Sequence, residues 1–240
     1  MCIRDSPSLA AFGVSDVLAR PRLQLFNSTG QVIRENSGWA ATTANLNEVS
    51  AAMIRTGAFP FSANSGNDAA LVATLPPGTY SIQVSDPSGQ GGVTLAEIYD
   101  AGDDSSDSRL VNLSIRGDVS AGEGSLISGF VLAGNASRRL LVRGDGPALT
   151  QYGVASALAD PTIGVYGASG LLLASNDDWS AGSAGPTLAT AALSAGAFPL
   201  IAGSKDAALS LSVAPGLYTV QLTGANAATG AALIEIYELP

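Results

Sequence analysis

The chain has 240 residues, enough for one large β-domain or for two domains of ordinary size. Its net charge is −9, its charged residues make up 13% and its hydrophobic residues 46%, a composition that favours packed strands with small side chains. With no histidine and one cysteine, the chain excludes disulfide frameworks, Cys/His zinc sites, Ser-His-Asp triads and Cys-His dyads within itself. The acidic balance argues against a nucleic-acid partner, and no apolar run approaches the roughly 18 residues of a membrane span.

The first five residues, MCIRD, match nothing later in the chain. They resemble the stub that read-through of a sequencing adaptor leaves at the start of a fragmentary reading frame. Residues 1–6 are therefore predicted to be non-native, with a short native tail as the alternative. On this interpretation the absence of a signal peptide carries no information about location.

From Pro7 onward the chain repeats itself at an offset that drifts from 140 to 138 residues. The clearest pair is Arg20–Trp39 and Asp160–Trp179, in which an alternating run meets a turn, runs back and closes on Asn-x-x-Trp. The period is that of a whole domain rather than of a solenoid repeat. Further pairs are Gly57-Ala-Phe-Pro with Gly196-Ala-Phe-Pro, Asp68-Ala-Ala-Leu with Asp206-Ala-Ala-Leu, Pro77-Gly-Thr-Tyr with Pro215-Gly-Leu-Tyr, and Glu97-Ile-Tyr with Glu235-Ile-Tyr.

Alternating apolar residues and glycine turns predict β-strands throughout the second copy. Gly167–Gly170 is a four-residue hairpin connection in this pattern. One short helix is predicted in each copy: residues 187–195 after Pro186, and residues 48–56 with Asn47 as the N-cap. The expected strands are 110–116, 125–133, 139–143, 162–166, 171–175, 207–213, 217–223 and 231–237.

Residues 102–108 are polar and are predicted to be a linker. The three expected strands that follow it have no counterpart before Pro7, so the first copy is expected to be truncated at its N-terminus and to have unpaired sheet edges. The predicted fold class is all-β, with two tandem jelly-roll-like β-sandwich domains that contain one short helix each. Residues 7–101 form the truncated first repeat and residues 109–240 the complete second repeat.

Asn176, Asp177 and Asp178 are the candidate metal ligands. Ca²⁺ takes six to eight oxygen ligands, which such side chains supply. The alternative is an Asx-rich turn, in which short polar side chains bond their own backbone. The first copy has Asn36-Ser37-Gly38 at this place, so Ca²⁺ is considered for the second copy only, and no other cofactor is expected.

Trp39 and Trp179 stand where a hairpin strand leaves for a loop. One interpretation is a stacking platform for a sugar ligand. The other, which we favour because few aromatic residues accompany them, is a buried residue that packs the loop against the sandwich. Tyr80 and Tyr218 each follow a proline turn at the start of a strand, which is typical of the corner tyrosine of Greek-key sandwiches.

Glu97 and Glu235 lie in apolar last strands, where a buried carboxylate needs a partner or acquires a raised pKa. Glu235 is expected to pair with Arg116 or Arg143, or to face solvent on the outer sheet. A glycosidase needs a second carboxylate nearby, and only Asp68 and Asp206 recur with the two glutamates, so catalysis is not favoured. The two Arg-Gly-Asp tripeptides, at 116–118 and 143–145, each end a predicted strand and are interpreted as structural.

Several motifs of the second copy resemble a repeated β-sandwich domain, of unassigned function, found in large secreted and surface proteins of environmental bacteria. The segment from Asp160 to the last strand is also similar, more distantly, to the bacterial pre-peptidase C-terminal domain, a jelly-roll-like sandwich appended to secreted hydrolases. These resemblances imply a fold and a secreted or cell-surface location, and they transfer no catalytic residue. The motifs are Leu110-Val-Asn-Leu-Ser-Ile-Arg-Gly, Gly129-Phe-Val-Leu, Leu141-Val-Arg-Gly-Asp-Gly-Pro-Ala-Leu, Ala159-Asp-Pro, Asn176-Asp-Asp-Trp, Gly196-Ala-Phe-Pro-Leu and Pro215-Gly-Leu-Tyr.

The favoured function is a non-catalytic extracellular accessory module that serves adhesion, spacing or presentation within a larger protein. The alternative is a carbohydrate-binding module, Ca²⁺-stabilised or not, attached to a secreted hydrolase. The expected partners are other domains of the same polypeptide and a polysaccharide or cell-surface ligand, with no nucleic acid and no membrane insertion.

Overall fold

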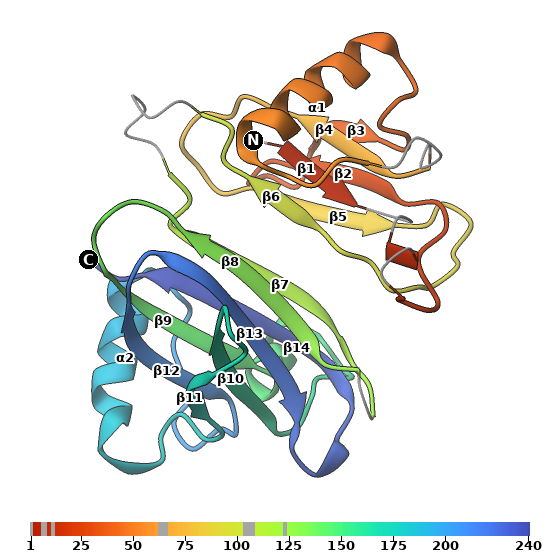
Figure 1. Cartoon of the computed structure of the whole chain (residues 1–240). Coiled ribbons are helices and arrows are strands. Elements are labelled where there is room, and N and C mark those ends of the chain that lie inside the picture. Colours follow the sequence, from red (N-terminus) through yellow and green to blue (C-terminus); the bar gives the residue numbers. More distant parts are fainter. Residues whose placement is uncertain (1, 6–8, 11–12, 62–66, 103–108, 122–123) are drawn as a thin grey trace. The chain divides into compact units, whose positions relative to one another are not determined.

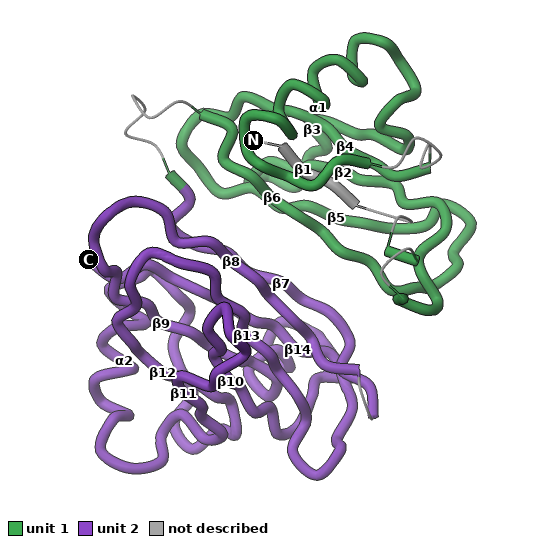
Figure 2. Tube along the Cα trace, in the orientation of Figure 1, with its two compact units in different colours: residues 1–109 green, residues 110–240 purple. Residues whose placement is uncertain are grey.

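The computed structural model describes residues 2–5, 9–10, 13–61, 67–102, 109–121 and 124–240 (Figure 1). The chain divides into two compact units, residues 1–109 and 110–240 (Figure 2). Of the predicted linker, residues 103–108 lie outside the described residues. No helix in the described ranges is both long enough and apolar enough to be a membrane span.

The second unit is a sandwich of two four-stranded antiparallel sheets, ordered β12-β9-β14-β7 and β11-β10-β13-β8. The chain changes sheet between most successive strands, which is the connectivity of a jelly roll. The predicted all-β sandwich is therefore confirmed, and each expected strand of this copy is present. The strands are β7 (Asn112–Val119), β8 (Leu126–Leu132), β9 (Arg138–Asp145), β10 (Pro161–Gly167), β11 (Leu172–Asn176), β12 (Ala207–Val213), β13 (Gly216–Gly224) and β14 (Gly230–Glu238).

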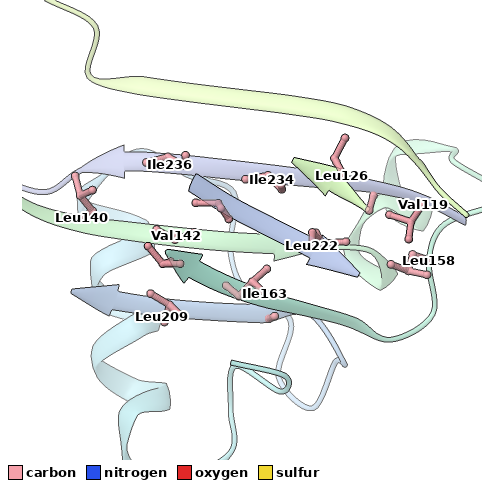
Figure 3. Close-up of a cluster of buried hydrophobic side chains, with 14 of the residues drawn as sticks. Val119, Leu126, Leu140, Val142, Leu158, Ile163, Leu209, Leu222, Ile234 and Ile236 are labelled. Atoms are coloured by element: carbon pink, nitrogen blue, oxygen red, sulfur yellow. The ribbon is translucent and has the colours of Figure 1, made fainter. Parts of the chain in front are cut away.

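Alternation along these strands places one face of each sheet in a common core (Figure 3). Val142 and Ile234 come from one sheet and Ile163 and Leu222 from the other, and all four are fully buried. Each large aliphatic side chain removed from water in this way stabilises the fold by about 1.5–3 kcal/mol. The sandwich thus rests on the period-two pattern of its strands.

Helix α2 (Gly185–Ser194) covers the outer face of the sheet that contains β9 and β12 (Figure 1). Leu188 of the helix packs with Leu141 of β9 and Ala208 of β12 in a second apolar cluster. Ala208 is therefore buried although it points away from the main core. The predicted helix is confirmed, and it begins at Gly185 instead of residue 187.

The first unit has two three-stranded sheets, ordered β4-β1-β6 and β3-β2-β5. These strands take the places that β12-β9-β14 and β11-β10-β13 take in the second unit. No strand in the described part of the first unit takes the place of β7 or β8. The strands are β1 (Cys2–Asp5), β2 (Arg22–Phe26), β3 (Val32–Asn36), β4 (Ala69–Val72), β5 (Ser81–Ser85) and β6 (Glu97–Tyr99).

Strand β1 extends the repeat further back than Pro7. Arg4 lies opposite Ala70 and Glu97, and Arg143 of the second unit lies opposite the equivalent residues Ala208 and Glu235. The expectation that three strands lack a counterpart is therefore wrong for one of them. A strand of four residues is too short for its alternation to be recognised in the sequence. That residues 1–6 are non-native stays a prediction, and Met1 and Ser6 lie outside the described residues.

Helix α1 (Thr43–Thr56) begins one turn earlier than predicted, and its N-cap is Thr42 rather than Asn47. The Thr42 hydroxyl accepts a hydrogen bond of 3.2 Å from the backbone N–H of Asn45, as an N-cap residue does. The Asn45 side chain donates to the Trp39 carbonyl oxygen at 2.6 Å, which ties the first turn to the preceding loop. The same Nδ2 donates to the carbonyl oxygen of Ala70 on β4 at 3.2 Å, so a contact with a distant strand also stabilises this helical turn, which contains two asparagines.

Candidate functional site

The repeated Asn-x-x-Trp motif joins the two sheets of the sandwich. Asn176 ends β11 in one sheet, and its Oδ1 accepts a hydrogen bond of 2.9 Å from the N–H of Ala208 on β12 in the other. Trp179 continues the connection, because its backbone N–H donates to the carbonyl oxygen of Asp206 at 2.9 Å. The first unit repeats both contacts, from Ala70 N–H to Asn36 Oδ1 at 3.1 Å and from Trp39 N–H to Asp68 O at 2.8 Å.

Trp179 is buried, with 6% of its surface exposed, as the structural interpretation predicts. It packs in the apolar cluster under α2. The indole N–H donates inside the unit, at 3.0 Å from Ile201 O and 3.2 Å from Ser204 Oγ. Trp39 is partly exposed, and its ring centroid lies 4.8 Å from that of Phe61.

The side chains of the candidate metal ligands have partners within the protein. Asp177 Oδ1 accepts from the Thr162 hydroxyl at 3.0 Å. Asp178 Oδ2 lies 3.0 Å from the ammonium of Lys205, the only lysine of the chain. The same ammonium lies 3.9 Å from Asp160 Oδ2. The hydrogen bond to Asp178 and the charge of Asp160 raise the pKa of Lys205, so this cation is retained at neutral pH.

Both ends of the Asn176 side-chain amide are hydrogen-bonded. Oδ1 accepts from the Ala208 N–H, and Nδ2 donates to the Asp178 carbonyl oxygen at 3.4 Å. Across the residues that the structure describes, no group of three or more His, Cys, Asp or Glu side chains is arranged to hold a metal ion. Calcium at Asn176, Asp177 and Asp178 stays a prediction, and it would compete with Lys205 for Asp178.

A charged cluster lies around Arg143, whose exposed fraction is 0%. Its Nη2 lies 2.8 Å from Asp145 Oδ1, and its Nη1 lies 3.4 Å from Glu235 Oε2. Nη1 also donates to the Phe198 carbonyl oxygen at 2.8 Å, and the guanidinium lies over the Phe198 ring, 3.9 Å from its centroid. The expected pairing of Glu235 with an arginine is thus made by Arg143.

The carboxylates around Arg143 occupy different environments. Burial raises the pKa of Asp145 well above its ordinary value; the charge of Arg143 lowers it and that of Glu235 raises it further. Glu235 Oε1 accepts from the Tyr237 hydroxyl at 2.6 Å, and burial followed by this bond raises the pKa of Tyr237. In the first unit, Tyr99 donates to Glu97 at 2.8 Å in the same way. Glu235 and Glu97 are thus each held by a tyrosine hydroxyl from their own strand.

Asp206, which recurs as Asp68, is also fully buried. Its Oδ1 accepts from the N–H groups of Gly146 at 2.8 Å and Ala148 at 3.2 Å. It thereby caps the start of the 3₁₀ helix Pro147–Tyr152, where backbone donors lack helical partners. The aspartate that recurs with the glutamate therefore has a structural role in the second unit.

The Arg-Gly-Asp tripeptide at 143–145 is internal, since Arg143 and Asp145 are both fully buried. Its Gly144 is required by packing, because a Cβ there would collide with the side chain of Ile163. The tripeptide at 116–118 lies on β7, at the edge of its sheet, and its Arg116 and Asp118 are exposed.

The two tyrosines predicted as corner residues make the expected contact. The hydroxyl of Tyr218 donates to the Ala214 carbonyl oxygen at 2.7 Å, and that of Tyr80 to the Pro76 carbonyl oxygen at 2.9 Å. Each bond ties the start of a strand to the turn before it.

Two participants are not found by sequence reasoning. Phe198 belongs to the repeated Gly-Ala-Phe-Pro motif, but nothing local shows that its ring lies against Arg143. Lys205 is signalled only by being the sole lysine, placed directly before the recurring Asp206. Both contacts join residues more than 25 positions apart, beyond what spacing can indicate.

No protein-family model and no curated protein matches the chain. Among solved structures, one match is the pre-peptidase C-terminal domain of a collagenase from Bacillus anthracis. It has 12% identity and a TM-score of 0.33, and the match covers 52% of this chain and 89% of that one. Another is the VP2 subviral particle of infectious bursal disease virus, with 12% identity, a TM-score of 0.19, and coverage of 99% and 56%.

Proposed function

We propose that the chain is a non-catalytic extracellular accessory module that spaces or presents other domains of the same polypeptide. The observation that carries the proposal is the burial of Trp179, whose indole N–H is bonded inside the unit. An aromatic platform for a ligand would instead offer a ring face to solvent. The extracellular location is supported by the resemblance of the sequence to repeated surface domains.

We propose that the chain is non-catalytic because its candidate acid, Glu235, is buried and held by partners within the protein. A general acid or base must exchange a proton with a substrate that reaches it. Glu235 is buried, and it is held by Arg143 at 3.4 Å and by Tyr237 at 2.6 Å. A carboxylate held in this way serves the stability of the sandwich, on which loops can be presented.

Carbohydrate binding is the second candidate, and Trp39 is the observation that favours it. This indole is partly exposed, whereas the equivalent Trp179 is buried, so part of its surface is open to a ligand. Calcium at Asn176, Asp177 and Asp178 would belong to this candidate as a stabilising ion.

The substitution Trp179→Ala tests the proposal. We expect it to lower the free energy of unfolding of the second unit by about 3–5 kcal/mol, the usual cost of truncating a buried aromatic residue. Urea unfolding of both proteins measures this change. Affinity electrophoresis through gels that contain polysaccharide should show no retention of the wild-type chain.

Trp39→Ala is the matched variant, at the equivalent position of the first unit. If the wild-type chain is retained in such gels and Trp39→Ala is not, while its unfolding is unchanged, the carbohydrate-binding module replaces the spacer as the favoured function. Retention lost in a stable Trp179→Ala variant would have the same consequence.

A further inference from the structure

Strand β8 is an edge strand of the second unit. It pairs with β13 from Leu126 to Leu132 without a register shift, and it is the last strand in the order β11-β10-β13-β8. Among the residues that the structure describes, β13 is the one strand that pairs with it. A regular edge without a bulge presents backbone N–H and C=O groups that can pair with a further strand.

The other edges of this sandwich carry features that oppose such pairing. Strand β7 carries the exposed charges of Arg116 and Asp118, and charge on an edge strand protects it. Strands β11 and β12 are tied to each other, because Asn176 Oδ1 accepts from the Ala208 N–H. Strand β8 reads Leu-Ile-Ser-Gly-Phe-Val-Leu, with no charge and no proline. It therefore lacks the usual protection of an edge strand.

The outer face of the sheet beside β8 is apolar and uncovered. Ile127 and Val131 of β8 are 51% and 68% exposed, and Leu217 of β13, which lies opposite Val131, is 60% exposed. The outer face of the other sheet is covered by α2 and holds the buried Ala208. Apolar surface of this kind gains free energy when it is removed from water.

The sequence of β8 is nearly palindromic about Gly129. A leucine stands at each end, β-branched Ile127 and Val131 come next, and the small Ser128 and the large Phe130 flank the glycine. When two such strands pair antiparallel with their glycines opposite, each residue meets the one that lies equally far on the other side of the glycine. Leucine then meets leucine, isoleucine meets valine, and serine meets phenylalanine. The strand is thus complementary to a second copy of itself.

We propose that two copies of the chain associate through their β8 strands, which pair antiparallel about a twofold axis at Gly129. Pairing would join two four-stranded sheets into one continuous sheet of eight strands. On its outer face, Leu217 and Val131 of one copy would lie in a row with Ile127 of the second copy. The inference goes beyond the proposed function and does not depend on it.

The core-facing side chains of β8 would also gain neighbours. Phe130 and Leu132 pack on the core but are only partly buried. In the proposed register, Phe130 lies beside Ser128 of the second copy, and Leu132 lies beside Leu126. The contact is one strand pair about 24 Å long, which places it among small interfaces. We therefore expect the dimer to dissociate in the micromolar range.

Head-to-tail pairing of β8 with β11 of a second copy is the competing arrangement. It would leave one β8 and one β11 free at the ends, so that association would continue into a filament. Strand β11 has five residues, and its pairing with β10 shifts register between Val165 and Tyr166. A longer strand without a shift, such as β8, is matched better by its own copy.

Sedimentation equilibrium of the full chain tests the proposal through charges placed at the two β-branched positions. The wild type should dimerise. Ile127→Lys with Val131→Lys should weaken association roughly a hundredfold, because two apolar pairs become two like-charge pairs. Ile127→Lys with Val131→Glu should retain the dimer, because each lysine then faces a glutamate of the second copy. Both positions are exposed, so all of these variants should fold.

Two further measurements use matched chains. An equimolar mixture of the Lys/Lys variant with Ile127→Glu, Val131→Glu should recover the dimer, since opposite charges then meet across the axis. Leu172→Lys places a charge on β11, where this leucine is 49% exposed, and it should leave association unchanged.

Disulfide trapping fixes the register, in a Cys2→Ser background. Gly129→Cys should give a disulfide-linked dimer, because the two copies of this position face each other. A side chain has room there, since the nearest atom to an added Cβ is Tyr218 O at 3.8 Å. Ile127→Cys alone should stay unlinked, because its two copies would lie about 13 Å apart, and it should link when it is mixed with Val131→Cys.

Four results would overturn the proposal. They are a wild type that stays monomeric up to several hundred micromolar, association that persists unchanged in the Lys/Lys variant, equal impairment of the Lys/Lys and Lys/Glu variants, and loss of the dimer in Leu172→Lys. The second result would assign the contact to another surface of the chain, and the last would assign it to head-to-tail pairing.

Discussion

Arg143 carries its charge at a position with no exposed surface, and the residues around it make this tolerable. Moving an unpaired charge from water into a protein interior carries a desolvation penalty of several kcal/mol. A buried arginine therefore needs charged and polar partners. Asp145, Glu235 and the Phe198 carbonyl oxygen provide them. One carboxylate of this set, Asp145, has a raised pKa, and it gives the cluster a pH dependence.

The substitution Asp145→Asn should reveal that dependence. Below about pH 3.9, the ordinary pKa of the group, Asp145 is protonated in both the folded and the unfolded protein. As the pH rises towards the raised folded pKa, the unfolded chain loses the proton while the folded chain retains it, so stability falls. We expect the free energy of unfolding of the wild type, relative to Asp145→Asn, to decrease through this window.

Urea unfolding of both proteins from about pH 4 to pH 8 measures this difference. Taking the difference between the two proteins cancels the titration of the carboxylates that do not interact with Asp145, whereas Glu235 and Asp206, whose charges act on Asp145, contribute to the difference. A difference that is flat across the range, or that grows with pH, would contradict the raised pKa of Asp145.

Lys205 gives a test of the calcium proposal. Its ammonium lies 3.0 Å from Asp178 Oδ2, so a cation bound by Asn176, Asp177 and Asp178 would compete with it for the Asp178 carboxylate. Lys205→Met removes this competitor and leaves the carboxylates of Asp160 and Asp178 without their cation. We expect millimolar Ca²⁺ to raise the melting temperature of this variant more than that of the wild type, as a ligand of the native state does.

The triple substitution Lys205→Met, Asp177→Asn, Asp178→Asn is the control, and it should lose the shift. Mg²⁺ at equal concentration should act more weakly, because it demands a more regular geometry. Melting temperatures that do not respond to Ca²⁺ in any of these proteins would leave the asparagine and aspartates with their structural role alone.

Among the elements, the connection of β11 to β12 depends on one side chain. Asn176→Ala removes the acceptor of the Ala208 N–H, which lies on a residue that is fully buried. A buried donor left without a partner costs about 1–3 kcal/mol. We expect this loss in the urea unfolding of the second unit, with the strand content by circular dichroism preserved.

Asn176→Asp separates the two ends of the amide. It keeps the acceptor for Ala208 and loses the 3.4 Å donor to the Asp178 carbonyl oxygen, so it should recover most of the lost stability. Asn36→Ala, at the matched place in the first unit, should destabilise that unit alone. Equal stability of Asn176→Ala and the wild type would show that the motif does not join the sheets.

The strands of the second unit are predictable because each one is long enough to show its alternation. β12 coincides with the expected 207–213, and β10 differs from its expected range by one residue at each end. β1 is missed because four residues carry too little pattern. The early start of α1 is missed because the Asn45 contact with Trp39 O depends on the folded loop.

The side-chain partners of the site are less predictable than the strands. The repeat itself indicates that Asn176, Trp179 and Asp206 matter, because they recur where the loops around them differ. Their partners are set by the sandwich, which brings β11, β12 and the 3₁₀ helix together. Sequence spacing cannot show that Lys205 faces Asp178 or that the guanidinium of Arg143 lies over Phe198.

At the scale of the whole chain, the two repeats differ in the number of strands that the structure describes in each sheet. The second unit closes its sheets with β7 and β8, and its core residues Val220 and Leu222 are fully buried. Within its described residues the first unit has three strands in each sheet, and the counterparts Ile82 and Val84 are partly exposed. Because burial of apolar surface is the main favourable term in folding, the two units should differ in stability.

Limited proteolysis should show this difference. Trypsin can cut the first unit at Arg34 and at Arg55 in α1, both of which are exposed, and local opening of a less stable unit makes such sites accessible. We expect early loss of residues 1–109 and accumulation of a resistant fragment that begins just after Arg109. Mass spectrometry of the fragment gives its first residue, and Asn36→Ala should accelerate its release. Equal resistance of the two units, or a first cut within residues 110–240, would contradict the view that the edge strands β7 and β8 make the second unit the more stable one.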